Sequence, residues 1–143
     1  MTRNQKTSSD EIKRLLGLVE RDLRQADASG LELDGVFGFL YNVALQLATI
    51  AIRLRNLRVR QPGFHRETFR LATDLVPERL KPAILSFERA RRKRNALTYD
   101  RAGVITNADV ESSRESIAVF EIWVRQEAAL YLASDEQAAC DPD

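Results

Sequence analysis

The segment from residue 88 to residue 103 carries the side chains of this chain that are best suited to binding an anion. Four consecutive cations are followed there by an amide, a phenol and a carboxylate: Arg91, Arg92, Lys93, Arg94, Asn95, Tyr99 and Asp100. A guanidinium binds phosphate through two parallel hydrogen bonds, and an amide or a phenol beside it can donate more. The segment therefore predicts a site for a phosphate-bearing ligand.

The spacing of the preceding apolar residues shows which way two of these arginines should point. Leu80, Ile84 and Phe87 follow one another at steps of four and three, which places them on one buried stripe of a helix. Arg91 and Arg94 continue the same stripe. Because an unpaired buried guanidinium is not tolerated, we expect these two cations to pair with acids, to open into a groove, or to contact another chain.

Further polar residues are candidates to support this site. His65 is the only histidine, so any imidazole chemistry must come from it, although a structural hydrogen bond at a helix start would also explain it. Asn42 and Gln46 begin a polar stripe on an otherwise apolar segment. That stripe is interpreted either as a solvent-facing edge or as polar groups turned toward the arginines.

The elements that must position these residues are predicted to be helices joined by short loops. Ser8 and Glu11 are spaced as a capping box at the first helix start, and Thr106 and Asp109 give a similar signal for the last helix. The predicted helices span residues 8–28, 34 to 57 or 59, 65–73, 82–99 and 106–133, and one separate turn precedes Pro82. Outside this helical domain, 8–133, we expect a flexible N-terminus, 1–7, and a disordered tail, 134–143.

The last predicted helix carries two apolar stripes. One contains Ile117, Phe120, Val124, Ala128 and Tyr131, and the other contains Val119, Trp123 and Leu130. A helix with two apolar faces can pack inside its own domain on one side and against a second copy on the other. This pattern predicts a homodimer.

Composition narrows the class of protein. The chain has 143 residues, of which 44% are hydrophobic and 30% charged, and its net charge is +1, as expected for one soluble globular domain with local charged patches. One cysteine excludes an internal disulfide, and no spacing of Cys and His predicts a zinc site. We expect no cofactor, no metal, no membrane partner and a cytoplasmic location, since the N-terminal residues lack the apolar core of a secretion signal.

The segment Arg94 to Asp100 resembles the signature of the HEPN superfamily, in which an Arg-Asn pair is followed after a few residues by His. The stretches Phe39 to Ala48 and Gly63 to Phe69 also resemble the second helix and the following turn of bacterial HEPN-type proteins. The resemblance covers about nine tenths of the chain. It implies an all-α fold, a bundle of four main helices plus a short helix, which the apolar periodicity predicts independently.

The resemblance implies an RNA-directed function. Many HEPN domains are metal-independent endoribonucleases that act as toxins or in defence, with Arg and His of two protomers meeting across a dimer interface. By position, Arg94, Asn95 and Tyr99 are the candidate catalytic residues; Arg91, Arg92 and Lys93 are candidates for binding nucleic acid, and Asp100, His65, Asn42 and Gln46 for support. Tyr99 replaces the family's histidine, and an unperturbed phenol has a pKa about three to four units higher.

Two other functions remain open at this point. HEPN domains are often found beside a nucleotidyltransferase, so the basic helix could bind such an antitoxin-like partner or RNA without cleaving it. Alternatively, Arg94 pairs with Asp100 or another acid and forms a polar lock inside a structural, homodimeric interaction module.

Overall fold

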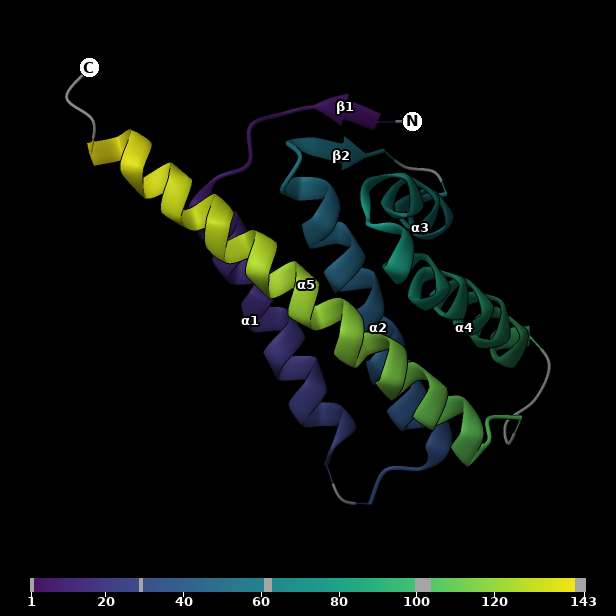
Figure 1. The fold of residues 1–143 in the computed structure, drawn as a ribbon. Coiled ribbons are helices and arrows are strands. Elements are labelled where there is room, and N and C mark those ends of the chain that lie inside the picture. Colours follow the sequence, from purple (N-terminus) through teal and green to yellow (C-terminus); the bar gives the residue numbers. More distant parts are fainter. Residues whose placement is uncertain (1, 29, 61–62, 100–103, 141–143) are drawn as a thin grey trace.

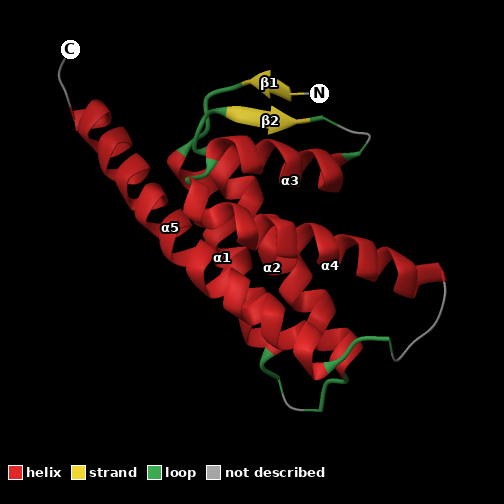
Figure 2. Cartoon of the chain, turned by 45° about the vertical axis from the view of Figure 1, so that its right-hand side comes forward, coloured by secondary structure: helices red, strands yellow, loops and turns green. Residues whose placement is uncertain are grey.

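The computed structural model describes residues 2–28, 30–60, 63–99 and 104–140 and shows a helical bundle (Figures 1 and 2). Its elements are β1 (Thr2–Asn4), α1 (Ser9–Ala26), α2 (Leu33–Arg53), β2 (Leu57–Val59), α3 (Phe64–Leu75), the 3-10 turn η1 (Glu78–Leu80), α4 (Lys81–Tyr99) and α5 (Asn107–Cys140). The all-α fold class is confirmed, with one addition. The strands β1 and β2 pair antiparallel at one end of the bundle.

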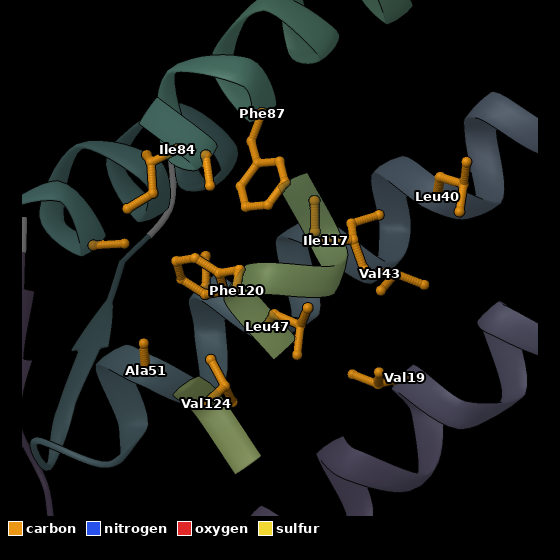
Figure 3. Close-up of a cluster of buried hydrophobic side chains, with 14 of the residues drawn as sticks. Val19, Leu40, Val43, Leu47, Ala51, Ile84, Phe87, Ile117, Phe120 and Val124 are labelled. Carbon is orange, nitrogen blue, oxygen red and sulfur yellow. The ribbon is translucent and has the colours of Figure 1, made fainter. Parts of the chain in front are cut away.

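Helix α2 forms the centre of the bundle because it is apolar around most of its circumference. It packs against α1, α3, α4 and α5. Figure 3 shows Leu47 of α2 facing Phe120 of α5, with Phe87 of α4 nearby. Among the described helices, α2 is the one whose length and composition would allow it to cross a membrane. Of its most apolar 18-residue segment, 56% is buried inside the structure.

A series of aromatic rings connects the helices through the core. Tyr41 of α2, Phe69 of α3, Phe87 of α4, Phe120 of α5 and Trp123 of α5 follow one another, and successive ring centroids lie 6.0, 6.0, 5.5 and 5.9 Å apart. Such offset and edge-on contacts add stability beyond the burial of apolar area. Tyr41, at one end of this series, is also in contact with the candidate site.

The start of α1 agrees with the predicted cap but not with the predicted partner of Glu11. Ser8 is the N-cap, and its hydroxyl accepts a hydrogen bond of 3.1 Å from the Glu11 amide. The Glu11 carboxylate does not reach back to Ser8, as a capping box requires. It accepts hydrogen bonds from Arg53 and Arg58 instead, because charged donors bind a carboxylate more strongly than a neutral amide does.

Helix α2 ends at Arg53, earlier than predicted. Asn56 adopts a left-handed backbone conformation with φ of 59°, and Leu57–Val59 form β2. The N-terminal segment, expected to be flexible, pairs with this strand, with Thr2 opposite Val59. After α2 the chain therefore turns at Asn56 and pairs with the N-terminal segment, instead of continuing the helix.

The later helix starts agree more closely with the sequence. Pro82 lies in the first turn of α4, and η1 supplies the separate turn that precedes it. Thr106 and Asp109 form the reciprocal cap of α5, since each accepts a hydrogen bond from the other's backbone amide. Helix α5 continues past residue 134, where the disordered tail was expected to begin, and its Asp135 binds the hydroxyl of Ser9.

Candidate functional site

The candidate site lies where the second half of α4 meets the start of α3 and the first half of α2. Along α4, Ile84 and Phe87 are buried and Ala90 is 8% exposed, whereas Arg91 and Arg94 are half-buried. The apolar stripe of α4 therefore changes into a polar edge at the point predicted from its spacing. Two grooves are lined in part by this edge.

The first groove, called here the His65 groove, has a volume of about 420 Å³. It is lined by residues from the start of α3 and from α4: Gly63, Phe64, His65, Arg66, Arg91 and Asn95. Gly63 is the N-cap of α3 and has a left-handed φ of 78°, which an L side chain rarely adopts. This turn places the first amides of α3, together with three of its side chains, beside the cationic part of α4. Helix N-termini favour anions because these amides have no partner within the helix.

The second groove, called the Asn42 groove, contains Arg94. It has a volume of about 250 Å³ and is lined by α2 and α4 through Gly35, Gly38, Phe39, Asn42 and Arg94. The Arg94 guanidinium lies 5.0 Å from the centroid of the Tyr41 ring, in a cation–π contact. Such a contact holds a cation beside a buried ring while one side of the cation faces the groove.

Tyr41 contacts one residue of each groove. Its ring makes the cation–π contact with Arg94, and its hydroxyl lies 3.0 Å from Nδ1 of His65. Tyr41 is only 2% exposed, and this burial raises its pKa to about 12, although Arg94 and Arg91 act in the opposite direction. The phenol therefore keeps its proton at neutral pH.

His65 is a neutral imidazole in this environment. Burial lowers its pKa below the ordinary value, and the positive charges of Arg94 and Arg91 lower it further. Arg91 forms an ion pair with Glu88 on the same helix at 3.0 Å, which raises the pKa of Arg91 and keeps it charged. The His65 groove therefore presents guanidinium, amide and neutral imidazole groups together.

Some residues predicted for the site lie elsewhere. Lys93 contacts Asp109 of α5 at 2.7 Å, and Arg92 is exposed and is not among the residues that line either groove. Gln46 donates a hydrogen bond of 2.8 Å to Asp22 of α1, so the polar stripe of α2 turns toward α1 beyond Asn42. The difference follows from Asp22, a buried carboxylate that requires a donor.

The structure brings five predicted residues to the grooves: His65, Arg91 and Asn95 to the first, and Asn42 and Arg94 to the second. Tyr99 ends α4, but its side chain and all of Asp100 lie outside the described part of the chain. Sequence reasoning did not identify Tyr41, Phe64 or Arg66 as site residues. Tyr41 occurs in an apolar run and gives no polar signal of its own.

Comparison of the chain with protein-family models, with curated proteins and with solved structures found no match. Within residues 2–28, 30–60, 63–99 and 104–140, no three His, Cys, Asp or Glu side chains are grouped so that they could hold a metal ion.

Proposed function

We propose that this chain is an RNA-directed domain of HEPN type that acts as a metal-independent endoribonuclease with an altered motif, in the manner of a toxin or defence effector. The observation that carries the proposal is the convergence of Arg66, Arg91, Asn95 and His65 on one groove, with Arg94 in a second groove. The resemblance of the Arg94 to Tyr99 segment to the HEPN signature supports RNA as the ligand.

The arrangement suits a phosphodiester better than a small carboxylate. Tyr41 contacts Arg94 of one groove and His65 of the other, so the two grooves can take separate parts of an extended chain, and each contains an arginine. In the proposed reaction, Arg94 holds the scissile phosphate and stabilises the charge that develops on it. Phe64 lines the His65 groove and offers an aromatic face on which a base can stack.

The first test is the variant Arg94→Ala, with Arg24→Ala as its control. Arg24 is an exposed arginine on α1, so its removal changes the net charge equally without touching either groove. We expect Arg94→Ala to reduce cleavage of a fluorescent RNA by about 100-fold or more while the far-ultraviolet circular dichroism stays unchanged. Equal cleavage by the two variants would refute the proposed role of Arg94.

The second candidate function is a non-catalytic module that binds nucleic acid or a nucleotidyltransferase-type partner. One reason to favour it is that Tyr99 stands at the position of the family's histidine. Another is that Lys93 is paired with Asp109 and Arg91 with Glu88, and this pairing reduces the positive charge free for catalysis. RNA binding that falls steeply between 50 and 200 mM salt, roughly as the number of phosphate contacts requires, without any cleavage, would support it.

A further inference from the structure

We propose that His65 binds a backbone phosphate of the ligand as an uncharged hydrogen-bond donor through Nε2, and that Tyr41 is the positioning residue that fixes this tautomer. The inference rests on the proposed RNA-directed function, and it holds for cleavage and for binding alike. It gives His65 a role in ligand recognition instead of the acid–base role that the histidine missing at position 99 would have had.

The tautomer follows from the surroundings of the Tyr41 hydroxyl. Tyr41 is almost fully buried, and a buried hydroxyl proton requires an acceptor. In the described part of the chain, the hydroxyl has Nδ1 of His65 as its hydrogen-bond partner at 3.0 Å. When Tyr41 donates to Nδ1, that nitrogen is unprotonated and the ring proton of neutral His65 is on Nε2. Nε2 is thus a donor.

The charges around His65 favour the same state. Tyr41 faces it from α2, Arg91 and Arg94 from α4, and Arg66 lies beside it on α3. Glu88, an acid whose charge acts on Tyr41, is paired with Arg91. A further positive charge among these guanidiniums is unfavourable, so the imidazole stays neutral. A neutral donor can still form part of a phosphate site, because the arginines supply the positive charge and the imidazole N–H donates a directional hydrogen bond.

The first experiment measures how the contribution of His65 depends on pH. The variants His65→Leu and His65→Gln and the unmodified chain are titrated with a 2′-O-methyl RNA 12-mer, which cannot be cleaved through its 2′-oxygen, at pH 7.0 and 8.5 in 50 mM salt. We expect His65→Leu to bind about three- to tenfold more weakly at both pH values. His65→Gln, which keeps an uncharged N–H donor, should recover part of the loss.

The alternatives give different results in this titration. If His65 acted as a cation, its contribution would disappear at pH 8.5, and equal affinities there would overturn the inference. Unchanged binding by His65→Leu at both values would also overturn it while leaving the proposed function intact. Failure of the unmodified chain to bind RNA would refute the RNA-directed function and the phosphate contact together.

The second experiment observes the tautomer directly and does not depend on RNA. Because His65 is the only histidine, nitrogen-15 NMR of the labelled chain gives one pair of imidazole signals. We expect the protonated nitrogen to be Nε2 in the neutral form. Tyr41→Phe should raise the pKa of His65, because it removes a hydrogen bond that stabilises the neutral form. Protonated Nδ1, or a pKa that falls in Tyr41→Phe, would overturn the role given to Tyr41.

Discussion

Glu11 joins three parts of the chain through one carboxylate. It lies in the first turn of α1 and accepts hydrogen bonds from Arg53 at the end of α2 and from Arg58 in β2. Its side chain is only 14% exposed. Glu11→Gln is expected to lower the free energy of unfolding at pH 7 by about 2–3 kcal/mol, because it leaves two guanidiniums without their acid. Urea denaturation measures this difference.

The effect of this substitution should depend on pH. The hydrogen bond from Arg58, together with the charges of Arg53 and Arg58, lowers the pKa of Glu11 in the folded state. A lowered pKa stabilises the fold above the ordinary Glu pKa of 4.5, and this stability is lost as the pH falls through the folded value. The difference between the unmodified chain and Glu11→Gln should therefore shrink below about pH 4. Glu136→Gln, at an exposed position, is the matched control. A cost that stays constant down to pH 3 would contradict this explanation.

The direction of the arginines in the candidate site could be predicted from sequence because one helix carries that signal. The steps from Ile84 and Phe87 to Arg91 and Arg94 lie within α4, and helical geometry alone places the arginines at the edge of the core. The contact between Tyr41 and His65 joins residues 24 positions apart on two helices. No local pattern predicts it, because it depends on how α3 packs on α2.

The end of α2 likewise could not be predicted from the local sequence. Apolar periodicity continues through Leu57, so a helix was predicted there, but the chain turns at Asn56. The Asn56 side-chain oxygen accepts hydrogen bonds from the Thr7 amide and the Tyr131 hydroxyl, and its backbone carbonyl accepts one from the Gln5 amide. These contacts come from both ends of the chain. By contrast, the caps Ser8 and Thr106 bond within their own first turns, and the sequence predicted both.

Asn56 provides a test of this turn. Asn56→Ala and Asn56→Gly both remove the side-chain amide and its hydrogen bonds, so both should be less stable than the unmodified chain. Glycine adopts a φ near 59° without steric cost, whereas the same conformation destabilises an alanine by about 1 kcal/mol. Asn56→Ala should therefore be the less stable variant by about that amount in thermal or urea unfolding. Equal stability of the two variants would show that the left-handed backbone is not retained.

For the whole molecule, the exposed face of α5 bears on the assembly of the protein. The sequence grouped Trp123 with Val119 and Leu130 on one stripe, but Trp123 is 7% exposed and belongs to the core. Val119, Ile122 and Leu130 are 50%, 62% and 67% exposed, and their steps of three and eight put them on one face of the helix. An apolar face of this kind is typical of a contact surface between proteins. The predicted homodimer would use this face.

Light scattering after size exclusion tests that prediction. We expect a mass of about twice 16.2 kDa for the unmodified chain and a shift toward the monomer for Ile122→Glu, because a carboxylate at the centre of an apolar contact is left without a partner. Leu31→Glu is the control, since Leu31 is an exposed apolar residue that lies before α2 and does not belong to this face of α5. A monomeric unmodified chain would exclude the dimer. Because Ile122 lines neither groove, RNA binding by the Ile122→Glu monomer then shows whether one copy of the chain forms a complete site.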